Sequence, residues 1–398
     1  MLVRLSYFCD MLNSVYATEY ARWFERGHIA ILATNGGSVK IWFESGTKRI
    51  RNMAAKQPVL RWQDKDNRMG MRSVQVVAGD IGGTKSWLAW FVRSGLHSGK
   101  ILFEQRYESA SFVDAQTMLR HFFRESGRDG VPDEVLLALP GPVQTQQVRL
   151  TNLAWEVDAA ALKNDLGVKK VWLVNDFQAA ARGVETLHKP DVQIINPGLL
   201  RVGGTRVITG AGTGLGLAWM QADDKGKYHV YASEGGHVDF APANAEQAGL
   251  LNWLWQRYPH VSWERLLSGD GLSSVYQYLC QQEQVRSLDV ACVSRSPAEI
   301  HALAARQDVL AGLAVQWFVD LYAAWVGNVA LLYQPRGGLY LAGGMAIHLQ
   351  NWLITPHFME IMVDKGRMQS IVREIPVYLV MTHRLGLQGA MLMHDSDV

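Results

Sequence analysis

The chain has 398 residues, enough for two domains and a sizeable hydrophobic core. Its 48% hydrophobic and 19% charged residues are typical of a folded soluble protein. The net charge of +2 gives no electrostatic case for nucleic acid or for an anionic membrane. The three cysteines lack metal-ligand spacing, which argues against a zinc site and a disulfide framework and suits a reducing compartment.

The first 70 residues differ from the rest, with 11 Lys/Arg against 6 Asp/Glu and no sustained strand or helix periodicity. Acidic residues such as Asp10 and Glu19 argue against a transit peptide, and a signal-peptide apolar region is missing. We expect residues 1–71 to form an N-terminal extension. It reflects either an upstream start assignment or a small accessory region.

Beyond residue 73, apolar runs of strand length alternate with segments of helical periodicity. Strands are predicted at 74–79, 86–92, 101–107, 134–138 and 170–174, and helices at 114–125, 158–165 and 177–187. The pattern restarts at 206, with strands at 206–209, 217–220, 228–232 and 338–342, and helices at 245–258, 308–333 and 386–394. This alternation predicts an α/β fold with mixed sheets, in two related lobes with a cleft between them.

No apolar run approaches the roughly 18 residues that span a bilayer. The strongest candidate, 310–332, is interrupted by Asp320. We therefore expect no membrane span.

Three glycine-rich loops follow predicted strands. They are Gly79-Asp-Ile-Gly-Gly-Thr84, Gly210-Ala-Gly-Thr-Gly214 and Leu341-Ala-Gly-Gly344. Glycine lets backbone N–H groups approach a phosphate closely, and Thr84 and Thr213 could add hydroxyl donors. Asp80 cannot bind phosphate itself, but it could hold a Mg²⁺ that bridges phosphates. Each loop alone is weak evidence, since a single Gly-Gly-Thr is more often a turn.

The three loops, in this order, resemble the two phosphate loops and the adenosine loop of the actin, Hsp70 and sugar-kinase superfamily. Between them lie Leu173-Val-Asn-Asp-Phe177, Glu234-Gly-Gly-His237 and Glu264-Arg-Leu-Leu-Ser-Gly269. With these motifs the chain closely resembles the bacterial-type glucokinases (group A hexokinases) from about Val74 to about Met393. The resemblance implies two RNase H-like lobes of the actin-like ATPase/sugar-kinase fold, with the active site between the lobes.

The resemblance also implies the roles of individual residues. Asp176 matches the catalytic base, although a helix N-cap is its simplest role by position alone. The residues that match sugar ligands are Asn175, Glu234, His237 and Glu264. Those that match nucleotide ligands are Gly79, Asp80, Ile81, Gly82, Gly83, Thr84, Gly212, Thr213, Gly214, Gly343 and Gly344, with Asp80 as the Mg²⁺ residue. Residues 151–155, Thr-Asn-Leu-Ala-Trp, resemble a segment near the sugar pocket.

The implied function is phosphorylation of D-glucose by MgATP to glucose 6-phosphate, the entry to glycolysis, in a cytoplasmic homodimer. The implied domains are a small lobe, 72–186, completed by a C-terminal helix at 386–398, and a large lobe, 187–385. Many relatives carry Asn-Ala-Arg where this chain has Lys85-Ser86-Trp87, which leaves the cation of the first loop open. The alternatives are a kinase for another hexose, a protein of the repressor/open-reading-frame/kinase (ROK) group, and a non-catalytic sugar or ATP sensor.

Overall fold

A computed structural model describes residues 30–35, 38–43, 73–95, 98–150, 153–282 and 293–394. The chain forms two compact units, 1–58 and 59–398. In the first unit, β1 (Ala30–Asn35) pairs antiparallel with β2 (Ser38–Phe43). The sequence analysis predicted no strand in either segment.

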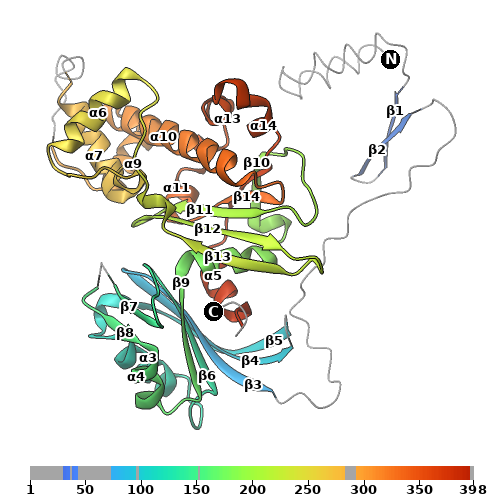
Figure 1. Ribbon diagram of the computed structural model, residues 1–398, viewed down its shortest axis with the longest axis vertical. Helices are drawn as coiled ribbons and strands as arrows, with labels where there is room; N and C mark the ends of the chain where they lie inside the picture. Colours follow the sequence, from blue (N-terminus) through green and yellow to red (C-terminus); the bar gives the residue numbers. More distant parts are fainter. Residues whose placement is uncertain are drawn as a thin grey trace. The chain divides into compact units, whose positions relative to one another are not determined.

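The second unit contains a five-stranded sheet in the order β5-β4-β3-β6-β9 (Figure 1). Its strands are β3 (Val74–Ile81), β4 (Lys85–Gly95), β5 (Ser98–Glu108), β6 (Glu134–Leu139) and β9 (Lys170–Asn175). β3, β4 and β5 form an antiparallel meander, whereas β6 and β9 run parallel to β3.

The same arrangement occurs again in a six-stranded sheet in the order β10-β15-β14-β11-β12-β13. Its strands are β10 (Val192–Asn196), β11 (Arg206–Ala211), β12 (Leu215–Ala222), β13 (Tyr228–Ser233), β14 (Gly338–Leu341) and β15 (Val377–Val380). Again a three-stranded meander is followed by two strands parallel to its first strand, and β10 is added at the edge. The shared topology explains why a glycine loop follows the first strand of each meander, β3 and β11.

Helices cover both faces of each sheet. On the five-stranded sheet, α3 (Ala115–Glu125) and α4 (Ala159–Leu166) bury their apolar sides against one face, beside the small β7–β8 hairpin (Gln147–Arg149 and Glu156–Asp158). One face of the six-stranded sheet packs against the helices of the largest core. They include α6 (Ala245–Trp255), α7 (Gly269–Cys280), α9 (Pro297–Ala305), α10 (Val309–Tyr333), α11 (Gly344–His348), α12 (Gln350–Leu353), α13 (Pro356–Val363) and α14 (Gln369–Arg373).

Two helices lie between the sheets. α5 (Asp176–Gly183) and α15 (Leu385–Leu392) bury residues against the five-stranded sheet and also against the second face of the six-stranded sheet. The helices cross closely, because a Cβ on Gly389 would overlap the carbonyl oxygen of Ala179. Any change in this crossing therefore reaches both sheets.

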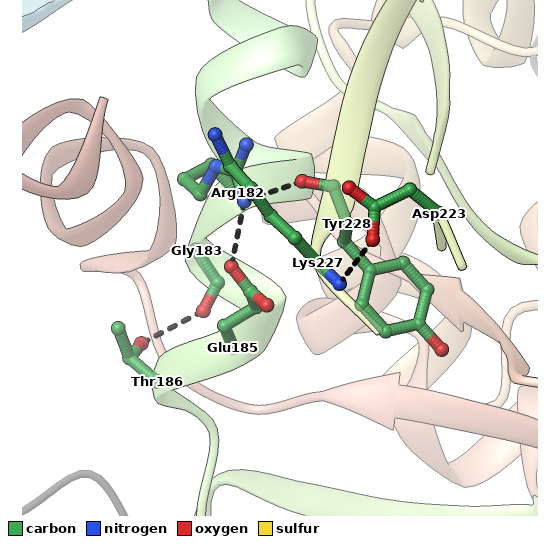
Figure 2. Close-up of polar contacts among 7 residues, drawn as sticks. All are labelled: Arg182, Gly183, Glu185, Thr186, Asp223, Lys227 and Tyr228. Carbon is green, nitrogen blue, oxygen red and sulfur yellow. Dashed lines mark hydrogen bonds and ion pairs between the residues drawn. The ribbon is translucent and has the colours of Figure 1, made fainter. Parts of the chain in front are cut away.

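A buried arginine ties α5 to the six-stranded sheet (Figure 2). The Arg182 side chain is 4% exposed, and its Nη1 donates to Glu185 Oε2 at 2.8 Å and to the Tyr228 carbonyl at 3.0 Å. Tyr228 opens β13, directly after a turn in which Asp223 Oδ1 accepts from the Lys227 N–H at 2.9 Å. A buried charge persists only when it is paired, so this contact fixes the C-terminal end of α5.

α10 confirms the helix predicted at 308–333, and it continues through Asp320 for 25 residues. By length and composition it is the one helix among the described residues that could cross a membrane, but 67% of its most apolar window is buried inside the protein. Asp320 accepts hydrogen bonds from Gln316 Nε2 at 2.7 Å and pairs with His357 at 2.9 Å. α10 is therefore the central core helix of the six-stranded half.

Candidate active site

Hydrogen bonds from Ser109 hold the turn of the first glycine loop. Gly82 N–H donates to the Lys85 carbonyl at 3.0 Å, which closes the turn between β3 and β4. Ser109 Oγ donates to the Gly82 carbonyl at 2.7 Å, and Ser109 N–H donates to the Thr84 carbonyl at 2.9 Å. These bonds hold the turn while Thr84 stays exposed. Ser109 lies 25 residues beyond Thr84, and no local pattern in the sequence pointed to it.

Asp80 begins a row of side chains that crosses three strands. The register places it opposite Trp87 on β4, which in turn is opposite Arg106 on β5. The Arg106 guanidinium lies 4.4 Å from the centre of the Trp87 ring, and Arg384 lies 5.3 Å from the centre of the same ring. Burial raises the pKa of Asp80 to about 6, and the nearby charge of Arg106 opposes that shift.

Arg106 is thus the cation that acts on Asp80, and the sequence analysis missed it. Lys85, the basic residue nearest the loop in sequence, forms an exposed pair with Glu108 at 3.9 Å. Such an exposed pair contributes little to stability. Arg106 is 26 residues from Asp80, and only the strand register brings the two together.

Asp176 is the first residue of α5, at the end of β9. The expected N-cap role belongs to Asn175 instead, whose Oδ1 accepts from the N–H groups of Phe177 at 2.9 Å and Gln178 at 3.1 Å. Asn175 Nδ2 donates to the Gly141 carbonyl at 3.2 Å. The N-cap of α5 is therefore Asn175, and within the described part of the chain one of its amide N–H groups remains for another partner.

The carboxyl group of Asp176 has the electrostatics of a base. Burial, followed by the charge of Asp80, raises its pKa to about 7. The Phe177 N–H, which donates to Asp176 Oδ1 at 2.8 Å, opposes the shift, and Glu234 adds to it. A carboxyl group poised near neutral pH can accept a proton from a hydroxyl group. The first loop and the predicted sugar residues therefore both act on Asp176.

Three predicted sugar residues form one cluster. Glu234 precedes a 3₁₀ turn, Gly235–His237, and Glu264 lies in another, Trp263–Arg265. His237 Nε2 is 3.7 Å from Glu264 Oε1. Burial raises the pKa of Glu234, with His237 opposing the shift and Glu264 adding to it. Clustered carboxylates and an imidazole suit a polyhydroxyl ligand, whose groups both donate and accept.

The second glycine loop joins β11 to β12 and contacts this cluster. Gly212 N–H donates to the Gly214 carbonyl at 2.8 Å, and Gly269 N–H donates to the Gly212 carbonyl at 3.0 Å. Leu215 N–H donates to Glu264 Oε2 at 2.8 Å. Thr213 is exposed at the tip. One predicted sugar residue therefore holds the base of a predicted phosphate loop.

The third loop follows β14, next to β11 and parallel to it. Gly343 has φ +94°, a conformation that favours glycine, and a Cβ there would lie 2.7 Å from the Ala211 carbonyl. A Cβ on Gly212 or Gly344 would meet nothing within 4 Å. The second and third loops thus adjoin each other, with open space beside Gly212 and Gly344, which fits a nucleotide at the carboxyl ends of parallel strands.

The residues present also fit a magnesium ion carried by phosphates. Among the described residues, no group of three or more His, Cys, Asp or Glu could form a protein-only metal site. Mg²⁺ in phosphoryl-transfer sites is usually bound by one or two carboxylates together with phosphate oxygens and water. Asp80, half-buried near Asp176 at the end of β3, provides that type of ligand. Thr151 and Asn152, in the segment expected near the sugar pocket, lie outside the described residues.

The duplicated sheet topology, the glycine loops and the acid cluster define a sugar kinase of the actin-like ATPase fold, and the predicted fold class is confirmed. The glucokinase family profile matches residues 77–396, most of the chain. The chain therefore belongs to the glucokinase family.

Individual relatives agree with this assignment. The glucokinase of Synechocystis sp. is 36% identical over 348 residues, covering 81% of this chain and 98% of that protein. The crystal structure of a glucokinase from an Antarctic psychrotroph superposes with a TM-score of 0.67 at 28% identity, covering 80% of this chain and 98% of that one. A ROK family glucokinase from Streptomyces griseus, in complex with glucose and AMPPNP, has a TM-score of 0.54 at 18% identity, covering 79% and 97%. The last likeness concerns the fold.

Proposed function

We propose that Asp176 is the general base with which this glucokinase-family enzyme phosphorylates D-glucose, using ATP, to glucose 6-phosphate. The observation that carries the assignment is the position of its carboxyl group, whose pKa of about 7 reflects burial and the charges of Asp80 and Glu234. One of these neighbours belongs to the expected nucleotide loop and the other to the expected sugar cluster. A base between the two ligands is what transfer between them requires.

In this mechanism the glucose 6-hydroxyl oxygen attacks the γ-phosphorus, and its proton passes to the Asp176 carboxylate. The bond between the γ-phosphorus and the bridging oxygen of ADP breaks, and Asp176 later releases the proton to water. Asn175, Glu234, His237 and Glu264 would hold the sugar hydroxyls. Proton removal by a positioned carboxylate typically contributes about 10²–10⁴-fold to the rate.

The three glycine loops would bind the nucleotide. The loops Gly79 to Thr84 and Gly212 to Gly214 would bind the phosphates through backbone N–H groups other than those of Gly82 and Gly212, which are bonded to Lys85 and Gly214. Gly343 and Gly344 would lie beside the adenosine. Asp80 would hold Mg²⁺, directly or through water, and the ion when bound neutralises charge on the phosphates. We further propose that the enzyme acts in the cytoplasm, in glycolysis, as a homodimer.

The test is coupled production of hexose 6-phosphate from MgATP, with Asp176→Asn beside wild type and the exposed Asp165→Asn as a matched control. Asp176→Asn should lose at least 10²-fold in kcat. Because asparagine keeps the oxygen that Phe177 N–H bonds, glucose affinity by calorimetry should change by only a few-fold. Asp165→Asn should match wild type.

Each alternative reading predicts a different result. More than a tenth of wild-type kcat in Asp176→Asn would remove the base assignment. Faster turnover of another hexose by wild type would change the substrate but keep the base. Binding of glucose without phosphorylation of any hexose would overturn the kinase proposal in favour of a sensor.

A further inference from the structure

Glu264 contacts two parts of the site at once. Its Oε2 accepts from Leu215 N–H at 2.8 Å, at the base of the second glycine loop, and its Oε1 lies 3.7 Å from His237 Nε2. A Cβ on Gly214 would overlap the Glu264 carboxylate. The loop and the carboxylate are therefore packed directly against each other.

The backbone around Glu264 is held firmly. Trp263 is buried, its ring centroid is 5.0 Å from that of Phe240, and its N–H donates to the Val238 carbonyl at 3.1 Å. Because Val238 directly follows His237, this hydrogen bond joins the turn that follows Glu234 to the turn that contains Glu264. The Glu264 side chain, 31% exposed, projects from this anchored turn to the loop.

We propose that Glu264 is a positioning residue that couples sugar binding to nucleotide binding, by holding the second glycine loop with one carboxylate oxygen and offering the other to the sugar. The proposal rests on the proposed function. It assigns Glu264 a contribution to nucleotide affinity, which a residue that only binds sugar would not make. A sugar hydroxyl bound at Oε1 would limit the rotation of the Glu264 carboxylate. Its other oxygen, Oε2, would then hold the Leu215 N–H, and with it the second glycine loop, more firmly in place.

The coupling must be reciprocal. If glucose orders the loop through Glu264 and so tightens nucleotide binding, then nucleotide tightens glucose binding by the same factor. A carboxylate that loses its sugar partner still holds Leu215 N–H. The contribution of Glu264 to nucleotide affinity is therefore present even without sugar, and it can be measured separately.

The experiment measures the Kd of AMPPNP with Mg²⁺ by calorimetry, first without sugar. Glu264→Ala removes the acceptor for Leu215 N–H and should weaken binding about tenfold, as loss of a charge-assisted hydrogen bond implies. Glu264→Gln keeps an acceptor oxygen and should stay within about threefold of wild type. Glu264→Asp keeps the charge but is one methylene too short, so it should resemble Glu264→Ala. Glu234→Ala is the matched control: Glu234 lies in the same cluster, but within the described part of the chain it makes no hydrogen bond to the loop, so the variant should bind AMPPNP as wild type does.

The second measurement is the ratio of glucose Kd values without and with AMPPNP, which should approach one in Glu264→Ala. Wild-type nucleotide affinity in Glu264→Ala and Glu264→Asp would overturn the coupling and leave Glu264 as a sugar ligand only. Equal weakening in Glu234→Ala would also overturn it, because loss of cluster charge would then be the cause. The sugar-free measurement stands whether or not glucose proves to be the substrate, so the two proposals fail separately.

Discussion

At the scale of single residues, the site brings together carboxyl groups whose ionised form is disfavoured by burial. Asp80 and Asp176 both have pKa values raised above the ordinary 3.8, to about 6 and about 7, and burial is the first cause for each. An ionised carboxylate that is costly in the free protein becomes favourable when a cation or a hydroxyl ligand arrives. We therefore expect the ionised carboxylates of this site to lower the stability of the ligand-free enzyme, a cost that serves its activity.

The stability of the free enzyme should reveal this cost through its pH dependence. Because the folded-state pKa of Asp176 lies above the unfolded value, its contribution to stability is full below about pH 4 and is lost as pH rises through about 7. Asp176→Asn should therefore be more stable than wild type at pH 8, by roughly 1–3 kcal/mol, and nearly equal to it at pH 4. Thermal unfolding at both pH values, without ligands, measures the difference. A variant less stable than wild type at pH 8 would contradict the burial argument.

At the scale of elements, the crossing of α5 and α15 depends on glycine. Gly183 lies against the Leu385 carbonyl, and Gly389 lies against the Ala179 carbonyl and the Gly183 nitrogen. Arg182, next to Gly183, is bonded to Glu185 and to the Tyr228 carbonyl (Figure 2). Neither helix can shift without disturbing the other or the six-stranded sheet, and α5 begins with Asp176.

A methyl group at this crossing should damage both stability and activity. Gly389→Ala forces the helices apart, and overpacking of this kind typically costs about 1–3 kcal/mol. We expect a lower Tm and a lower kcat, because α5 carries the base. The matched control is Gly312→Ala within α10, where an added Cβ meets nothing within 4 Å, so helix propensity alone should act and Tm should hold or rise slightly. Equal effects of the two substitutions on Tm would refute the role of the crossing.

At the scale of the whole molecule, the described hydrophobic cores lie in the part of the chain after residue 73. The four clusters of buried residues comprise positions 76–393, and the family profile matches 77–396. None of these described core residues, and none of the positions matched by the profile, falls within residues 1–70. The predicted lobe boundaries, and the two readings of the N-terminal segment, remain predictions.

A truncated chain that begins at Met71 should therefore retain kcat and KM within about twofold, and Tm within about 2 °C, because its core is intact. A chain that ends before Leu385 is the control, since it loses α15 and with it the crossing on α5, and it should not fold stably. A large loss of activity in the Met71 chain would favour the accessory-region reading. Mass spectrometry of the native protein would show whether Met1 is its true start.

Much of the fold could be read from local pattern. The strands that end in glycine loops and the helices at α3, α4 and α10 were predicted to within a few residues, because apolar periodicity and turn residues are local signals. The missed elements include β10, β15, α7, α9 and α11 to α14. β15 is only four residues long, too short for a clear alternation, and α7 begins with Gly269-Asp-Gly271, which reads locally as a turn.

The sequence by itself determined the family, the α/β class and the candidate residues. Glycine loops and their neighbouring acids are short motifs, and each can be identified from a few consecutive residues. Only the tertiary structure decided which groups act on one another. Strand register brought Arg106 to Asp80 across Trp87, and the anchored turn at Trp263 brought Glu264 to Leu215 N–H. At the start of α5 the structure also assigned the N-cap to Asn175 instead of Asp176. The contacts of Arg106 and Glu264 join residues tens of positions apart, and packing fixes them where no local pattern records them.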